Sequence, residues 1–470
     1  MNVENSLILA LFENLDLSKK SPLINSHHCA FHSMKIIRIL AILVLLVFVM
    51  MVYGSLVLHY AEGGNRLQIL KSPILKFVRF PRKINYTLSS PAFTGIPDTY
   101  QKIEEGLERI NRLDYDLYGL NSIWKDNTWL IALYDFRGEK MTYTWNLKSV
   151  KSQLKPEGLL WENAPPRHSL MLEDKDVIVQ FSVTPNMARL DSNSNVKWVN
   201  HDLIYHHSLN IDPDSSSIWA CGFARDSSYQ WNPNQNVKMA NGVIAKYSDD
   251  EIVKIDISTG KTLWRKSVTD ILVDNGYTGL AFGLNFTDAI HLNDVQPALL
   301  DSEYWKKGDL FLSLRNKSVV ILYRPSTNEV IKVMSGPFLN QHDVDIISSN
   351  KISIFSNNAI FNYQYKNISV EKGGIAKHQL NTSCIVEYDF EKDEYEIISE
   401  DIFLKEEIFT QTEGQSEILE NGDVYIENQN NGTIYVIRDD EILLKWYFDT
   451  NMKGYVYYPN WIRLYSKSNI

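Results

Sequence analysis

Two different patterns of hydrophobic residues divide the chain. Residues Ile39 to Leu58 form an apolar run of 20 residues without a charged side chain. As an α-helix this run is about 30 Å long, which matches the hydrocarbon core of a bilayer. It is longer than the apolar stretch of most cleaved signal peptides, and no small-residue cleavage pattern follows it. We therefore expect an uncleaved transmembrane helix over residues 36–58 and a single-pass membrane protein.

After this run the pattern predicts a stalk and a short helix. A basic, proline-containing stretch extends from His59 to about Pro97, and the segment DTYQKIEEGLERINRL from Asp98 to Leu113 has apolar residues at helical spacing. We expect residues 59–115 to form the stalk and this helix. Residues 1–35 form a separate N-terminal segment, which is cytoplasmic or lies outside the mature protein if Met34 is the true start.

From about Asp116 to the end, short alternating strands and turn residues replace the helical pattern. Four segments open with a histidine, at His168, His207, His291 and His342. Each continues through a turn into a second apolar strand, and these strands are VIVQF, IWACG, LFLSL and ISIFS. A fifth copy begins at Gly414, which replaces the histidine, and a degenerate sixth copy lies near NTWLIALYDF.

The length of the repeat indicates the architecture. About 350 residues in six copies give about 60 residues per repeat, which suits a four-stranded blade with loops. The sequence therefore predicts an all-β fold, a six-bladed β-propeller over residues 116–470. We expect this domain on the extracytoplasmic side of the membrane, although the charges that flank the apolar run do not fix the orientation.

Composition excludes some functions and leaves one covalent question open. The net charge of −10 argues against a broad nucleic-acid surface. The three cysteines Cys29, Cys221 and Cys384 form no CxxC pair, so no zinc or redox motif is present. Spacing alone leaves open whether Cys221 and Cys384 form a disulfide.

The register of the histidines points to a shared site. The first strand of each blade lines the central channel, so residues at one place in each repeat converge there. Arg315 follows the strand LFLSL, and a guanidinium beside several imidazoles suits a tetrahedral oxyanion better than a cation. Three histidines could also bind zinc, but we expect neither a metal nor another cofactor.

The stretch from His291 to Asn358 resembles the core of the bacterial arylsulfotransferases that do not use an activated-sulfate nucleotide. The shared motifs are HLND, GDL-x-x-S-x-R and a G-P-x-x-x-QHD segment, and HHSLNID at His206 resembles an earlier histidine segment of the family. The resemblance is strong over residues 200–360 and loose over residues 116–470.

This resemblance implies a function and a set of residues. It implies transfer of a sulfuryl group from an aryl sulfate donor to a phenolic acceptor through a sulfohistidine. His342 matches the nucleophile, and His207, His291 and Arg315 match the substrate-binding residues. The repeat register favours His207 over His206. Three further residues are expected nearby, His168 as a substrate-funnel residue and Asp294 and Asp343 as carboxylates that fix histidine tautomers.

Two other classes of function remain open. A membrane-anchored propeller can be a non-catalytic binding or assembly module, and Ile252 to Trp264 resembles the repeat of quinone-dependent dehydrogenases and their scaffold relatives. Three histidines could also serve a metal-dependent hydrolase or lyase. The natural donor and acceptor, the oligomeric state and the membrane orientation do not follow from the sequence.

Overall fold

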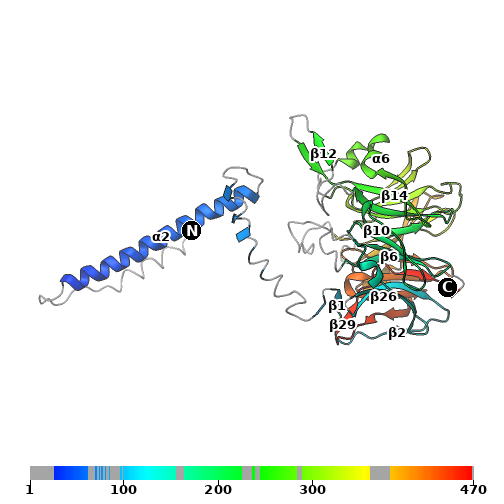
Figure 1. Cartoon of the computed structure of the whole chain (residues 1–470), viewed down its shortest axis with the longest axis horizontal. Coiled ribbons are helices and arrows are strands. Elements are labelled where there is room, and N and C mark those ends of the chain that lie inside the picture. Colours follow the sequence, from blue (N-terminus) through cyan, green and yellow to red (C-terminus); the bar gives the residue numbers. More distant parts are fainter. Residues whose placement is uncertain are drawn as a thin grey trace. The chain divides into compact units, whose positions relative to one another are not determined.

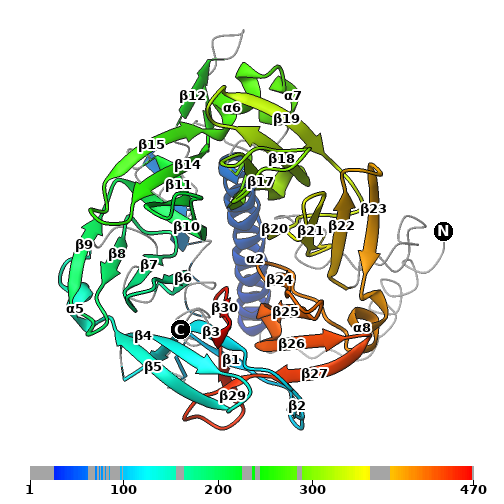
Figure 2. The ribbon, with the colours of Figure 1, turned by 90° about the vertical axis from the view of Figure 1, so that its right-hand side faces the viewer.

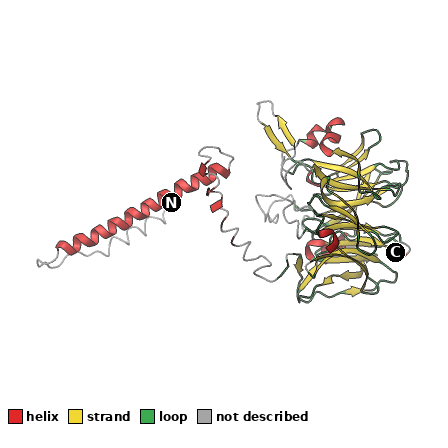
Figure 3. Ribbon diagram, viewed as in Figure 1, coloured by secondary structure: helices red, strands yellow, loops and turns green. Residues whose placement is uncertain are grey.

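The computed structural model describes two separate units of the chain (Figures 1 and 3). They comprise residues 1–96 and residues 97–470. The described residues are 26–61, parts of 69–84, 96–97, 99–126, 128–154, 164–224, 235–238, 244–282, 288–359 and 382–467. Residues 1–25 of the predicted N-terminal segment and much of the predicted stalk lie outside them.

The first unit contains a long apolar helix, α2 (Ser26–Ala61). Its span Ile37–His59 has a mean hydropathy of 2.8 and exposes its side chains. By length and composition this span could cross a membrane, although a signal sequence has the same properties. The predicted apolar helix is confirmed, and its placement in a membrane stays a prediction.

The second unit is built almost entirely of antiparallel sheets arranged in a ring (Figure 2). Among the described residues, six sheets have four strands or more and two are smaller. In each larger sheet one strand lies innermost in the ring and the others follow outward. The predicted all-β, propeller-like fold is confirmed at this level.

The larger sheets have the following strands, given from the inner strand outward. Three of them use consecutive segments in the first two thirds of the chain: β6 (Pro166–Met171), β7 (Val177–Phe181), β8 (Met187–Leu190) and β9 (Val196–Asn200); β10 (Leu203–Ile211), β11 (Ser217–Ala224), β14 (Asp250–Asp256) and β15 (Thr262–Ser267); β16 (Leu292–Pro297), β17 (Leu310–Leu314), β18 (Val319–Arg324) and β19 (Glu329–Met334). The other three include the C-terminal part: β20 (Val344–Ile346), β21 (Lys351–Ser356), β22 (Cys384–Asp389) and β23 (Glu394–Ile398); β24 (Gln415–Ile418), β25 (Val424–Asn428), β26 (Thr433–Arg438), β27 (Glu441–Trp446) and β2 (Ile110–Asn111); β30 (Arg463–Tyr465), β3 (Tyr118–Lys125), β4 (Thr128–Asp135) and β5 (Lys140–Asn146).

The remaining elements are short. The two small sheets consist of β1 (Tyr100–Lys102), β29 (Tyr455–Tyr457) and β28 (Phe448–Asp449), and of β12 (Gln235–Lys238) and β13 (Ile244–Tyr247). The short helices are α5 (Lys148–Lys151), α6 (Val268–Asp274), α7 (Thr278–Ala281), α8 (Glu400–Lys405), η1 (Arg315–Lys317) and η2 (Gln429–Asn431).

The predicted second strands of the repeats are real strands, because their residues are apolar on both faces. VIVQF is β7 and LFLSL is β17, and both are buried along their whole length. IWACG and ISIFS fall within β11 and β21. Core residues cluster between neighbouring sheets, as where Leu312 of β17 shares a cluster with Trp219 of β11. Each sheet therefore buries both faces against its neighbours.

The two ends of the second unit close the ring together. β30 pairs with β3, with Tyr118 opposite Tyr465. β2 pairs with β27, with Ile110 opposite Lys445. Pairing the N-terminal and C-terminal strands in shared sheets removes the open edges that a linear array would leave.

The predicted helix over Asp98–Leu113 is wrong for the described part of that segment. This part contains the strands β1 and β2 and turns between them. Gly106 has a φ of 86°, which interrupts a right-handed helix. The segment has strand partners from the C-terminal region, β29 and β27, and pairing with them prevails over its local helical periodicity.

Cys221 and Cys384 are free and buried. Cys221 lies on β11 and Cys384 on β22, which belong to different sheets. Cys221 contacts the hydroxyl of Ser208 at 3.5 Å, and Cys384 accepts a hydrogen bond from the amide of Asn358 at 3.2 Å. No disulfide joins them.

Candidate active site

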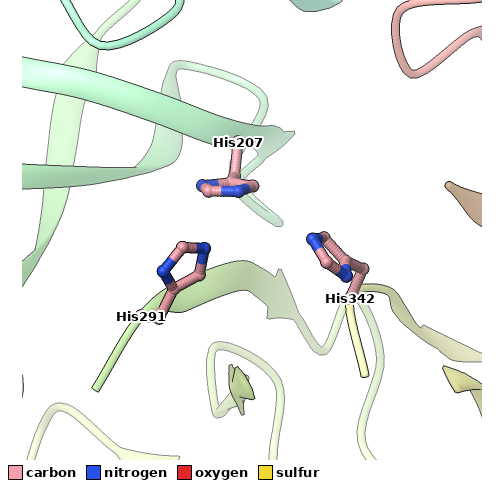
Figure 4. A group of neighbouring side chains, drawn as sticks. All are labelled: His207, His291 and His342. Carbon is pink, nitrogen blue, oxygen red and sulfur yellow. The ribbon is translucent and has the colours of Figure 1, made fainter. Parts of the chain in front are cut away.

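Three of the predicted residues meet at the centre of the ring. His207 lies at a bulge in β10, His291 comes directly before β16, and His342 lies two residues before β20. One nitrogen from each ring lies within 4.8 Å of the others. Figure 4 shows the three rings facing one another. Neighbouring sheets of the ring thus deliver three imidazoles to one point.

Two of these histidines have a backbone conformation that is rare for residues other than glycine. His207 has a φ of 54° and His291 a φ of 56°. The left-handed region is uncommon for residues other than glycine, and such strain persists where the surrounding structure enforces it. His168, Gly414 and Trp461 have positive φ values at the same place in other sheets. A shared kink before or within the inner strand therefore accompanies the histidine repeat that the sequence revealed.

His342 is held at both ring nitrogens. It is 1% exposed, and its Nδ1 lies 2.5 Å from Oδ1 of Asn357. The amide oxygen can only accept, so Nδ1 carries the hydrogen and Nε2 carries the lone pair. The backbone N–H of Glu413 donates to that Nε2 at 3.0 Å. The tautomer suits a nucleophilic Nε2, whose lone pair is hydrogen-bonded in this structure.

His207 contacts a second histidine, which in turn contacts a carboxylate. Nδ1 of His207 lies 2.7 Å from Nδ1 of His206, so the two atoms share one hydrogen. Nε2 of His206 lies 3.3 Å from Oδ1 of the buried Asp250. His206 also stacks on Phe223 at a centroid distance of 4.2 Å. His207 thus lies in the cluster and His206 behind it, and the choice of His207 as the substrate-binding histidine stays a prediction.

His291 is oriented by a carboxylate that the sequence analysis missed. Its Nδ1 lies 2.9 Å from Oδ2 of Asp288, and Asn316 donates to the same oxygen at 2.9 Å. Burial acts to raise the pKa of Asp288, but its interactions with His291 and Asn316 outweigh burial and hold the pKa below its usual value. An ionised Asp288 fixes the hydrogen on Nδ1, which leaves Nε2 of His291 for the cluster.

Two arginines place positive charge around the cluster. Arg315 is 3% exposed, begins η1 and donates to the side chain of Asn316 at 2.9 Å. Burial lowers the pKa of His342 well below its usual value, and the charge of Arg315 lowers it further. Burial and then the neighbouring histidines lower the pKa of His207 well below its usual value. Both imidazoles are therefore neutral near neutral pH, as a nucleophile requires.

The second arginine, Arg167, was not predicted. Its charge contributes to the lowered pKa of both His207 and His342. It pairs with Glu413 at 2.6 Å, and both side chains are largely buried. The repeat register carried a signal for both residues, because Arg167 precedes His168 and Glu413 precedes Gly414.

An indole ring borders the histidines. Trp461 is fully buried, and its ring centroid lies 5.9 Å from that of His207 and 6.2 Å from that of His342. Glu427 accepts hydrogen bonds from the backbone N–H groups of Trp461 and Ile462 and holds this segment in place. The indole of Trp461 thus packs an apolar ring against the cluster and excludes water from that side.

Two of the remaining predicted residues line a neighbouring cavity of about 290 Å³, and Asp294 does not. His168 lines it, together with Asp343, and Nδ1 of His168 accepts the backbone N–H of Leu209 at 3.2 Å. Asp343 accepts from the N–H of Ser416, and Asp294 accepts from Asn210. His168 is thus near the cluster through Trp461, at a centroid distance of 5.5 Å, but is not part of it.

The predicted tautomer-fixing role of Asp294 and Asp343 is wrong. Both carboxylates bind groups of neighbouring strands, because side chains along a strand point alternately to opposite faces. Asp288 and Asn357 hold the histidines instead. Burial raises the pKa of Asp294 to about 7.

The three histidine nitrogens could also hold a metal ion. Three nitrogens that bind tetrahedral zinc at about 2.0 Å lie about 3.3 Å from one another. The three histidine nitrogens lie within 4.8 Å of one another, which is compatible with this distance. The same nitrogen–nitrogen distances are compatible with a sulfuryl group between the rings. Arg315 and Arg167 add positive charge, which favours an anion. The donor set therefore fits an oxyanion better than a dication.

The fold and site define a class of protein: a propeller-like ring of sheets with a histidine and arginine site at its centre. The family model of the arylsulfotransferases (ASST) matches residues 168–446. The chain belongs to the arylsulfotransferase family, and the resemblance found in its motifs is confirmed. This membership supports aryl sulfotransfer as the general activity and an aryl sulfate and a phenol as the substrates.

Other comparisons give only distant likenesses. No curated protein matches the chain. A protein of unknown function from Bacteroides caccae is 10% identical, with a TM-score of 0.45 over 75% of this chain and 99% of the other. Hydrazine synthase from Kuenenia stuttgartiensis is 10% identical, with a TM-score of 0.38 over 67% and 74%. The WD40 β-propeller domain of Doa1 is 10% identical, with a TM-score of 0.37 over 79% and 98%.

Proposed function

We propose that the chain is a nucleotide-independent arylsulfotransferase that works through a sulfohistidine on His342. The observation that carries this proposal is the meeting of His207, His291 and His342 beside Arg315, with a neutral imidazole at His342 and surrounding positive charge. The six larger sheets would be the six blades of a propeller, residues 116–470 its main body, and residues 36–58 a membrane anchor for an extracytoplasmic enzyme.

The first half-reaction forms the covalent intermediate. Nε2 of His342 attacks the sulfur of the aryl sulfate, so that an N–S bond forms and the S–O bond to the aryl group breaks. In this scheme His206 enters the reaction with hydrogens on both ring nitrogens, facing the carboxylate of Asp250. The leaving phenolate takes a proton from His207, which takes the proton of His206 in turn, so that both rings end neutral. Asn357 accepts from Nδ1 of His342 and stabilises the positive charge that the ring gains.

The second half-reaction reverses these steps with another phenol. The acceptor hydroxyl returns its proton to His207 while its oxygen attacks sulfur, the N–S bond breaks and neutral His342 is regenerated. The pair of histidines thus gives up one proton in the first half-reaction and regains one in the second, so that neither step needs a proton from bulk water. In both steps Arg315 donates to the sulfuryl oxygens, and His291 does so with hydrogens on both ring nitrogens and its charge balanced by Asp288. This preorganised charge is the largest contribution to catalysis.

The backbone N–H of Glu413 has two successive roles in this scheme. In the free enzyme it donates to Nε2 of His342 at 3.0 Å and must release it before attack. Breaking one such hydrogen bond costs about 1 kcal/mol. Once Nε2 is bonded to sulfur, the same N–H can donate to a sulfuryl oxygen, which compensates for the loss.

The experiment uses the full chain in detergent with an aryl sulfate and no nucleotide. Without acceptor, we expect one equivalent of phenol per chain and a mass increase of one SO3 group on a peptide containing His342. Added phenol should restore turnover and remove the label. Phenol release without a labelled peptide, or release that depends on a nucleotide, contradicts the proposal.

Two controls separate the other readings. Activity that survives dialysis against a chelator argues against a metal-dependent hydrolase or lyase, whereas activity that is lost and restored by zinc supports one. A folded chain that neither releases phenol nor acquires a label fits a non-catalytic binding or assembly module.

A further inference from the structure

A second pocket lies where the ring closes, away from the histidine cluster. We call it the seam pocket; it has a volume of about 450 Å³ and is lined by residues that include Tyr100, Arg109, Tyr134, Glu139, Trp446 and Asp449. These residues come from both ends of the second unit, on or beside β1, β2, β4 and β27. None of the three clustered histidines lines it.

The wall of the seam pocket is aromatic. The ring of Tyr134 packs edge-on against Phe448 at 5.3 Å, and Tyr100 packs edge-on against Tyr457 at 5.4 Å. The guanidinium of Arg109 lies over the ring of Trp446 at 4.3 Å. Such a planar, rigid wall binds flat apolar surfaces at a low cost in conformational entropy.

Two buried donors on this wall have no hydrogen-bond partner among the described residues. They are Nε of Arg109 and Nε1 of Trp446, and Trp446 is 3% exposed. Asp449 and the carbonyl of Tyr447 both engage the other end of Arg109, through Nη2 at 2.7 Å. Both atoms are covered by protein, so the groups that a ligand in the pocket can reach are the rest of the Arg109 side chain, which is 29% exposed, and the carboxylate of Asp449, which is 65% exposed.

The charge around the pocket excludes an anion. Three carboxylates, Asp126, Glu139 and Asp449, outnumber the two cations, Arg109 and Lys125. An aryl sulfate would meet net negative charge, and its sulfate offers only acceptors to these carboxylates. A phenol has only one hydroxyl group, whereas the seam pocket offers several hydrogen-bond donors and acceptors, so a phenol would leave most of them unpaired.

We propose that the seam pocket binds a neutral saccharide. A sugar ring combines an apolar face for the aromatic wall with hydroxyls that both donate and accept. Its hydroxyls donate to Glu139 and Asp449, its oxygens accept from the guanidinium of Arg109, and its apolar face packs on the aromatic wall. The volume of about 450 Å³ lies in the range of small-ligand pockets, about 300–1,000 Å³. The site would let the enzyme remain on a glycosylated surface or polymer while it acts on phenols.

The test measures binding of neutral trisaccharides of glucose, mannose and N-acetylglucosamine to the full chain in detergent, by ligand-observed NMR. We expect at least one to bind and Arg109→Ala to weaken binding by at least about tenfold. Glu139→Gln keeps the size of the side chain and should weaken binding of the same sugar. The matched control Arg137→Ala removes an arginine that pairs with Asp116 outside the pocket and should leave binding unchanged.

Sulfuryl transfer gives an independent readout, because the seam pocket contains none of the proposed catalytic residues. Both pocket variants should retain transfer to a simple phenol at the wild-type rate. The proposal is overturned if no trisaccharide binds, if both pocket variants bind as the wild type does, or if an aryl sulfate displaces the bound sugar.

Discussion

Replacing His342 with glutamine is the sharpest test of the proposed nucleophile. The imidazole is 1% exposed and bonded on both sides, to Asn357 and to the N–H of Glu413. Alanine would leave both partners buried and unpaired, at about 1–3 kcal/mol each, or about 2–6 kcal/mol in total. Because a domain is stable by only about 5–15 kcal/mol, His342→Ala could lose activity by unfolding.

Glutamine avoids this ambiguity. Its amide can accept from Glu413 and donate to Asn357, so we expect a loss of stability of at most about 1–2 kcal/mol. It cannot form the N–S bond. We therefore expect turnover to fall by about 10⁴–10⁶-fold, equivalent to about 5–8 kcal/mol in activation free energy.

The assay follows phenol release from an aryl sulfate alongside thermal unfolding and the mass of the His342 peptide. The matched control is His201→Gln, which changes a histidine that bonds the carbonyl of Pro185 outside the cluster. It should retain full activity. A folded His342→Gln variant with wild-type turnover, or a sulfuryl label on His207 or His291, refutes the assignment.

Three further predictions test the charge and packing around the site. Arg315→Lys keeps one charge but loses the planar fork for sulfuryl oxygens, so kcat should fall by about 10²–10³-fold with little change in thermal stability; an unchanged kcat would remove Arg315 from the site. Arg167→Met removes a positive charge that lowers the pKa of His342, so this pKa should rise. The acid limb of the plot of kcat/KM against pH should then move to higher pH. A limb that stays in place or moves to lower pH contradicts the scheme. Gly119→Val places a Cβ 2.7 Å from Phe136 at the ring closure, so unfolding measurements should show a loss of about 1–3 kcal/mol, and an unchanged melting temperature would mean that the seam can relax.

The carboxyl group of Glu417 predicts how the stability of the protein depends on pH. Glu417 lines the cavity of about 290 Å³ beside the histidine cluster, and burial raises its pKa to about 7. In the unfolded chain this pKa is 4.5, so the folded state binds more protons between the two values. Its contribution to stability is therefore present below about pH 4.5 and is lost as the pH rises through about 7. Melting temperatures between pH 4.5 and 7.5 should fall less steeply in Glu417→Gln, and an identical slope contradicts this reasoning.

The sequence alone determined those features that a local pattern encodes. The apolar run predicted the helix α2, and strands that are apolar on both faces predicted β7 and β17. The repeat placed the histidines in one register, so His207, His291 and His342 could be named together. A periodic pattern records which residues are buried and how often the chain turns, and both are properties of short segments.

Only the tertiary structure decided which partners complete the site. The N–H that binds His342 belongs to Glu413, 71 residues later in the chain. Trp461, which contacts the cluster, lies close to the C-terminal end of the chain. The strands β1 and β2 replaced an expected helix because their pairing partners lie in the C-terminal region. Such contacts arise only when the ring closes, and no local spacing along the chain encodes which distant side chains then meet.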